Sequence, residues 1–112
     1  MLKVALLGCG RWGLNHLEAM SNLRDKGLIE HITVVDISKE ARDNAVLADK
    51  VADNIQGINA DLVVIATPSH LHAEQSRSLI SSGYHVLVEK PVGKCESEAA
   101  QVIASARENG RI

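Results

Sequence analysis

Aromatic residues are scarce in this sequence of 112 residues, which contains one tryptophan, one tyrosine and no phenylalanine. Bases stack on aromatic side chains, so a stacking platform for nucleic acid is disfavoured. The 12 basic residues do not outnumber the 14 acidic ones, so an excess of positive charge to neutralise phosphates is also missing. The longest apolar run, residues 62–66, is far too short to cross a bilayer. These features argue against general nucleic-acid binding and against a transmembrane helix.

Cysteine is scarce as well. Cys9 and Cys95 lie at neither metal-ligand nor CxxC spacing, which favours reduced thiols and a cytoplasmic protein. The apolar stretch before Cys9 is too short for the core of a signal peptide. The five histidines show no HExxH-like spacing, so we expect no metal site. A composition of 46% hydrophobic and 23% charged residues is typical of one ordinary globular domain, here residues 1–112.

Strand and helix patterns alternate along the chain. Strands are expected at residues 2–7, 32–35, 50–52, 62–66 and 84–88, and helices at about 11–26, 39–48, 70–82 and 96–109. The strand segments are nearly continuous apolar runs, which is typical of strands covered on both faces. This pattern predicts an α/β fold with a Rossmann-like, doubly wound parallel sheet in the order 3-2-1-4-5 and helices on both faces.

The apolar residues of two helices predict which sides face the core. Ser38 is the expected N-cap of the second helix. The residues expected to be buried on the second helix are Ala41, Ala45, Val46 and Ala48, and those on the last helix are Ala99, Ala100, Val102, Ile103 and Ala106.

A GxGxxG pattern at residues 8–13 directly follows the first strand and opens the first helix. Gly8 permits the turn, Gly10 lets the backbone approach a pyrophosphate, and Gly13 allows the helix to pack close to the sheet. The N–H groups at the helix start, chiefly those of Arg11 and Trp12, can bind phosphates. A purely structural glycine turn is the alternative, in which Trp12 simply packs instead of covering a cofactor.

Asp36 ends the second strand, where a carboxylate can accept hydrogen bonds from the adenosine ribose hydroxyls of a dinucleotide. The same charge repels a 2′-phosphate, and the next residue is Ile37 where an arginine would bind such a phosphate. We therefore expect Asp36 and Ile37 to contact the cofactor, and NAD to be favoured over NADP. Lys39 leaves NADP open, because its ammonium could reach a phosphate.

Two further segments, TPSHLH at 67–72 and EKP at 89–91, follow central strands, where open α/β sheets bind ligands. Together with VALLGCGRWGLNH, Asp36, VVIATPSHLHAE and HVLVEKP, they make the chain resemble the N-terminal domain of the glucose-fructose oxidoreductase / inositol dehydrogenase (Gfo/Idh/MocA) family. The resemblance covers essentially the whole chain. It implies an NAD(P)-dependent oxidoreductase that transfers hydride between nicotinamide and a sugar-like, nucleotide-sugar or cyclitol hydroxyl.

The resemblance also implies roles for single residues. Thr67 and Pro68 would line the nicotinamide ribose with His72 close by, and Glu89 would face the nicotinamide. Lys90 would be catalytic, because it would meet both the cofactor ribose and the substrate hydroxyl. Without the resemblance, a lysine at the end of a strand is usually only a solvated charge.

Family members continue into a second, substrate-binding domain, so we expect this chain to be an isolated or truncated dinucleotide-binding domain that is catalytically incomplete. The alternative is a stand-alone dinucleotide-binding or regulatory module without turnover. The sixth strand of the family's sheet would be missing, which would leave the strand at 84–88 at an edge. We expect self-association through that edge, or its coverage by the chain's own terminus. The Lys90–Pro91 bond is expected to be cis, as in the family.

Overall fold

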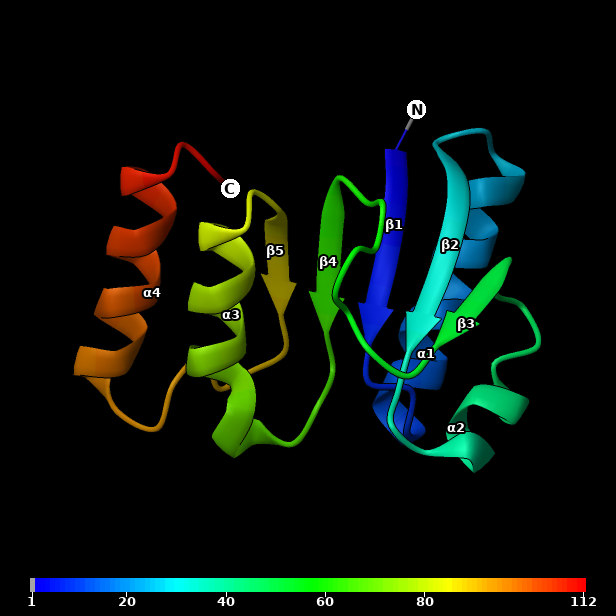
Figure 1. The fold of residues 1–112 in the computed structure, drawn as a ribbon, viewed down its shortest axis with the longest axis horizontal. Helices are drawn as coiled ribbons and strands as arrows, with labels where there is room; N and C mark the ends of the chain where they lie inside the picture. The colour runs from blue at the N-terminus through cyan, green and yellow to red at the C-terminus, as the bar shows by residue number, and fades with distance from the viewer. Residues whose placement is uncertain (1) are drawn as a thin grey trace.

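Five parallel strands form a single sheet at the centre of the molecule (Figure 1). The computed structural model describes residues 2–112. Its strands are Leu2–Leu7 (β1), Ile29–Val35 (β2), Lys50–Ala52 (β3), Leu62–Ile65 (β4) and His85–Val88 (β5). They lie in the order β3-β2-β1-β4-β5, as predicted, and each neighbouring pair is parallel.

Helices cover both faces of the sheet. They are Arg11–Asp25 (α1), Lys39–Asn44 (α2), His72–Ser81 (α3) and Glu96–Glu108 (α4), with a short 3-10 turn, Ser69–Leu71 (η1), before α3. Leu17 of α1 packs with Leu6 of β1, whereas Leu79 of α3 packs with Ala5. Because neighbouring residues of a strand point to opposite faces, α1 and α3 lie on opposite sides of the sheet. The predicted Rossmann-like fold class is confirmed.

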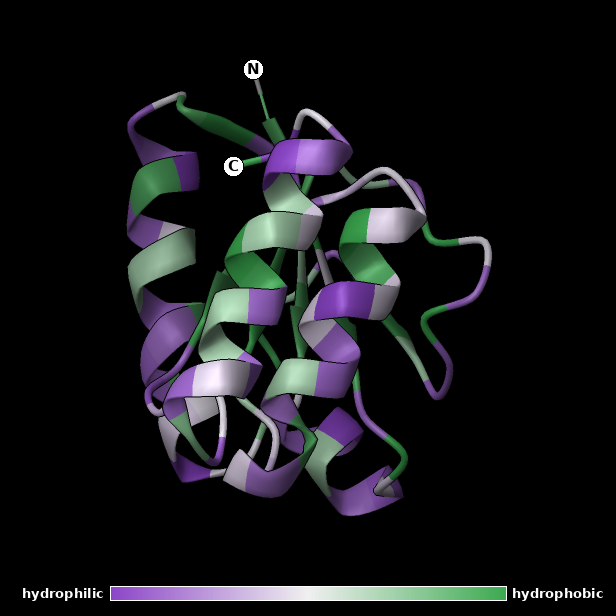
Figure 2. Ribbon diagram, turned by 90° about the vertical axis from the view of Figure 1, so that its left-hand side faces the viewer, coloured by the Kyte–Doolittle hydropathy of each residue, from purple (hydrophilic) through white to green (hydrophobic). Residues whose placement is uncertain are grey.

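Hydrophobic residues occupy the interior between these layers. Seen from the α4 end, the helices alternate between hydrophilic and hydrophobic residues, while the strands behind them are mostly hydrophobic (Figure 2). Val4, Leu6, Val34, Val63 and Ile65 are fully or almost fully buried in the central strands. Continuous burial along neighbouring strands explains their unbroken apolar sequences.

The second helix is shorter than predicted. Ser38 does cap it, since its hydroxyl accepts the Ala41 N–H at 3.2 Å, but the helix ends at Asn44. Ala45 leaves the helical conformation, and Val46 is 82% exposed instead of facing the core. The reason is the next strand: the Asp49 carboxylate accepts the Ile32 N–H at 2.8 Å, which turns the chain back toward the sheet before another helical turn could form.

The last helix buries less than its sequence predicted. Val102 is buried, but Ala100 is exposed and Ile103 is 53% exposed. α4 packs mainly on α3, through Val102 against Ala73 and Ile80, and not broadly on the sheet. A helix that packs mainly against one other helix buries only a narrow stripe of its surface, so two of the five residues predicted to be buried, Ala100 and Ile103, remain exposed.

β5 lies at one edge of the sheet. Its Val86 N–H donates a hydrogen bond of 3.0 Å to the backbone carbonyl of Ile112, so the chain's own last residue lies against this edge (Figure 1). Within residues 2–112, no helix has the length and apolar character needed to span a membrane.

Candidate functional site

A cavity of about 910 Å³ opens at the carboxyl ends of the strands. Its lining includes residues that follow β1, β2, β3 and β4, together with one side of α3. The predicted cofactor-binding residues that line it are Gly8, Gly10, Arg11, Trp12, Asp36, Ile37, Thr67 and Pro68. The predicted residues outside its lining are Gly13, His72, Glu89 and Lys90. The structure thus brings the first part of the predicted site together in one cavity and places the rest beside it.

The three glycines of the loop after β1 have different surroundings. Gly8 has a φ of +93°, and a Cβ there would lie 2.8 Å from the Ala66 carbonyl oxygen. A Cβ at Gly13 would lie 2.3 Å from the Gly8 carbonyl oxygen. A Cβ at Gly10 would meet no atom within 4 Å, because Gly10 faces the cavity. Gly8 and Gly13 therefore permit close packing of the protein against itself, whereas Gly10 leaves space for a ligand.

The start of α1 has the properties of an anion-binding site. Its N-cap is Gly10, which supplies no side-chain cap, and its first turn contains no acidic residue. The N–H groups of Arg11 and Trp12 precede the first intrahelical bond, from Leu14 N–H to the Gly10 carbonyl, and so have no intrahelical acceptor. Trp12 is 67% exposed at the mouth of the cavity. These groups fit the pyrophosphate of a dinucleotide.

Asp36 links the glycine loop to the end of β2. One oxygen of its carboxylate, Oδ2, accepts the Cys9 N–H at 2.8 Å, and Oδ1 accepts the Ser38 N–H at 2.9 Å. Each carboxylate oxygen has a further lone pair, so the group can still accept hydrogen bonds from ribose hydroxyls. Burial and the nearby Asp36 charge raise the pKa of the Cys9 thiol, which makes Cys9 a buried packing residue and a poor nucleophile.

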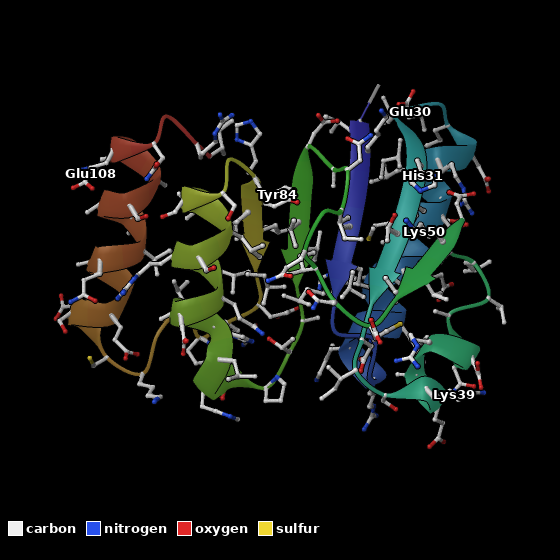
Figure 3. All side chains as sticks on the ribbon, viewed as in Figure 1. Glu30, His31, Lys39, Lys50, Tyr84 and Glu108 are labelled. Carbon is white, nitrogen blue, oxygen red and sulfur yellow. The ribbon has the colours of Figure 1, made fainter. Side chains whose placement is uncertain are left out.

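Two cations lie near Asp36, and both have protein partners. Arg42, which sequence reasoning missed, donates from Nη1 to the carbonyl oxygens of Asp36 and Ile37 at 2.8 and 3.0 Å. Lys39 projects from the exposed side of α2 (Figure 3) and forms an ion pair of 2.9 Å with Asp43. An arginine six residues after a strand-end aspartate, within the next helix, is the signal that could have identified Arg42.

Sequence reasoning also missed polar residues on the wall formed by α3 and by the loop after β3. These lining residues are Asp53, Asn54, Glu74, Gln75 and Ser78. Thr67 donates from Oγ1 to Gln75 Oε1 at 2.5 Å, which ties the loop after β4 to α3. Helical spacing could have indicated this wall, because Leu71 at the end of η1 is followed by Gln75 and Ser78 of α3 at intervals of four and three residues.

The EKP segment follows β5 and lies beside the cavity. The Glu89 carboxylate is hydrogen-bonded to Nε2 of His16, which lies on α1. This bond is the main reason that the pKa of Glu89 falls below its ordinary value. Lys90 is exposed. The bond between His16 and Glu89 joins α1 to a residue 73 positions away in the sequence.

His72 is buried, with 2% of its surface exposed. Its Nδ1 lies 2.8 Å from the Pro91 carbonyl oxygen, and its Nε2 lies 2.7 Å from the Thr67 carbonyl oxygen. Both ring nitrogens are thus engaged by the protein, and a direct hydrogen bond to a cofactor would require one of these contacts to break. The Lys90–Pro91 peptide bond is cis, as the family resemblance implied. Among residues 2–112, no three histidine, cysteine or acidic side chains gather as metal ligands.

Known proteins are similar to this chain in sequence. The sequence of 4-carboxy-2-hydroxymuconate-6-semialdehyde dehydrogenase from Sphingobium sp. (strain NBRC 103272 / SYK-6) is 29% identical over 120 residues, covering 99% of this chain and 36% of that protein. The scyllo-inositol 2-dehydrogenase (NADP(+)) IolW of Bacillus subtilis (strain 168) is 28% identical over 111 residues, covering 97% of this chain and 31% of that protein.

The fold is also similar to that of the WlbA dehydrogenase from Bordetella pertussis, solved in complex with NADH and UDP-GlcNAcA. The two structures superpose with a TM-score of 0.87 at 28% sequence identity, over 98% of this chain and 34% of that one. The chain therefore spans about a third of the length of these relatives. The family model described as "Oxidoreductase family, NAD-binding Rossmann fold" matches residues 2–112. By this match, the chain belongs to the Gfo/Idh/MocA family of oxidoreductases and forms its NAD-binding Rossmann fold.

Proposed function

We propose that this chain binds NAD in the cavity at the carboxyl ends of the strands, as the dinucleotide-binding domain of an oxidoreductase that acts on CH–OH groups. The observation that carries this proposal is the convergence of the glycine loop, Asp36 and Thr67 on one cavity of about 910 Å³. The pyrophosphate would lie against Gly10 and the start of α1, and the adenosine ribose against Asp36 and Ile37. Thr67 and Pro68 would line the nicotinamide ribose.

NAD is the preferred cofactor in this proposal. The Asp36 carboxylate would repel a 2′-phosphate on the ribose that it binds. The hydrogen bonds of Arg42 and the ion pair of Lys39 support the preference, because both cations already have partners in the protein. The related IolW protein is named as an NADP(+) enzyme, so the preference has to be measured for this chain.

Lys90 is the proposed catalytic residue. When bound, the nicotinamide ring supplies hydride transfer. In the reductive direction, the Lys90 ammonium would donate a proton to the substrate's carbonyl oxygen as its carbon receives the hydride. In the oxidative direction, the neutral amine would accept the hydroxyl proton. A sugar-like, nucleotide-sugar or cyclitol hydroxyl is the proposed substrate class, supported by the names of the relatives and by UDP-GlcNAcA in the WlbA complex.

The proposal also includes the location of the protein in the cell and its self-association. Cys9 and Cys95 are free thiols, which supports a reducing, cytoplasmic location. The exposed side chain of Leu87 on the edge strand β5 supports self-association through that edge, although Ile112 already occupies the Val86 N–H. Light scattering at rising protein concentration measures this association, and a constant monomer mass would refute it.

Titration with NADH tests the proposed cofactor site. Trp12 lies at the mouth of the cavity and is the only tryptophan in the sequence, so energy transfer from it to bound NADH is a direct signal. We expect saturable binding of NADH, and binding of NADPH at least about tenfold weaker, which corresponds to about 1.4 kcal/mol. Absence of NADH binding by folded protein would refute the proposal. Turnover with a panel of cyclitols, sugars and nucleotide sugars then distinguishes an enzyme from a binding module.

A further inference from the structure

The segment that contains Lys90 lies beyond the last strand, where the backbone hydrogen bonds of the sheet no longer fix its position. Glu89 makes the last sheet-like bond, from its N–H to the Ile65 carbonyl at 3.0 Å. β5 pairs with β4 along one side, and its other edge is bonded only to Ile112, through the Val86 N–H and the His85 side chain. Side-chain contacts from elsewhere must therefore fix the position of residues 89–91.

One such contact comes from the helix on one face of the sheet. His16 lies on α1, next to Leu17, which packs against Leu6 in the core of that face. Its Nε2 bonds to the Glu89 carboxylate. A carboxylate only accepts hydrogen bonds, so Nε2 carries the hydrogen and donates. Both side chains are partly exposed, and the pair ties α1 to the residue before Lys90.

The second contact comes from the opposite face. His72 begins α3, and its ring bridges the Pro91 and Thr67 carbonyl oxygens at 2.8 and 2.7 Å. A carbonyl accepts but never donates, so both contacts are hydrogen bonds only if the ring carries two N–H groups. The hydrogen bond from His16 is the largest of the causes that lower the pKa of Glu89, and the charge of His72 is the smallest of them.

Lys90 lies between these two anchored neighbours. Its side chain is exposed, and within residues 2–112 neither His16 nor His72 contacts it through a hydrogen bond. The two histidines therefore restrain the backbone on both sides of Lys90 while its ammonium remains available. His72 also links Pro91 to Thr67, and so holds the EKP segment beside the loop that lines the cavity.

We propose that His16 and His72 are positioning residues, which clamp residues 89–91 from opposite faces of the sheet and so set Lys90 against the nicotinamide half of the cofactor. This inference rests on the proposed binding of NAD. It concerns only the nicotinamide half, because neither histidine contacts the glycine loop or Asp36 through a hydrogen bond. The two halves of the cofactor therefore provide an internal comparison for a test.

The test compares NADH with ADP, which has the adenosine and pyrophosphate but neither the nicotinamide nor the ribose attached to it. Both ligands are titrated into the 112-residue protein and into its His16→Leu, His16→Gln and His72→Gln variants. We expect His16→Leu to weaken NADH about tenfold, the loss of roughly one hydrogen bond to a charged group, and to change ADP affinity less than about twofold. His16→Gln should recover part of the NADH affinity, because its amide can donate to Glu89. His72→Gln keeps one of two donor contacts and should also weaken NADH selectively.

His31→Leu is the matched control, because His31 lies on β2, its ring contacts Thr33 and lines no part of the cavity, and its loss should alter neither affinity. Equal weakening of NADH and ADP by the His16 variants would overturn the clamp, since it would indicate a general structural effect. Failure of the unchanged protein to bind either ligand would instead refute the proposed function. His72 is buried and its variant can unfold, so nitrogen-15 spectra of the unchanged protein provide a second measurement. We expect a ring N–H of His72 to be protected from exchange with solvent, and rapid exchange of every ring hydrogen would overturn its bridging role.

Discussion

The two halves of the proposed cofactor site are built in different ways. In the half formed by residues 8–13 and Asp36, glycines allow backbone segments to touch, and a carboxylate binds backbone N–H groups. In the half formed by residues 67–72 and 89–91, histidine side chains from two helices hold the loops in place. The first half should therefore be sensitive to added volume, and the second to the loss of a hydrogen bond or a proton.

Lys90→Ala should produce the largest effect, and it should slow the chemical step without weakening cofactor binding. Loss of a proton-transferring group typically reduces rates about 10²–10⁴-fold. We expect this loss in turnover by a catalytically active form that carries this domain, with NADH affinity changed less than about threefold. Steady-state kinetics and NADH titration measure the two quantities. Lys94→Ala, at a nearby exposed lysine, is the control. Equal losses in turnover and affinity would make Lys90 a cofactor-binding residue instead.

A pair of glycine substitutions should separate folding from binding in the first half. Gly13→Ala places a Cβ 2.3 Å from the Gly8 carbonyl oxygen, and we expect it to lower the free energy of unfolding by about 2–3 kcal/mol. Gly10→Ala adds the same methyl group in open space, at a φ of −77° that alanine adopts easily. It should cost less than about 1 kcal/mol of stability and yet weaken NADH about tenfold or more. Urea unfolding and NADH titration measure the pair, and equal stabilities would contradict it.

Asp36→Asn should change cofactor preference more than stability. The amide oxygen can still accept the Cys9 N–H, but the negative charge that repels a 2′-phosphate is removed. We expect NADH to bind about tenfold more weakly and the preference for NADH over NADPH to disappear. Asp25→Asn, at an exposed aspartate at the end of α1, is the control. An unchanged ratio of the two affinities would place the choice of cofactor elsewhere in the site.

The difference between the two halves of the site also determines how much of it could be predicted from the sequence. The glycine loop was predictable, because each glycine acts on the turn where it lies. The first strands were predictable from their nearly continuous apolar runs. The bond between His16 and Glu89 was not, since its partners are 73 positions apart and meet only after α1 and β5 join the sheet. α4 was predicted with too wide a buried side, because hydrophobic periodicity does not reveal that a helix packs mainly on one neighbour, here α3. Long-range pairing is the information that local patterns lack.

The smallest predicted effect concerns the pH dependence of the second half. The hydrogen bond from His16 lowers the pKa of Glu89, so the unfolded chain binds a proton at Glu89 more readily than the folded protein does. The stabilisation by this bond is therefore complete above the ordinary pKa of glutamate, about 4.3, and is lost as the pH falls through the lower pKa of the folded state.

Both side chains are partly exposed, so the contribution should be below about 1 kcal/mol. Urea unfolding of the unchanged protein and of His16→Leu between about pH 3 and pH 6 measures it. We expect the unchanged protein to be more stable near pH 6, with the difference shrinking toward pH 3 as Glu89 becomes protonated. His70→Leu removes an exposed histidine that makes no hydrogen bond within residues 2–112, and its difference from the unchanged protein should stay constant over the pH range where Glu89 titrates. A difference for His16→Leu that stays constant to pH 3 would mean that the ring stabilises the protein by packing and not through the Glu89 carboxylate, and the second half of the site would then depend on volume just as the first half does.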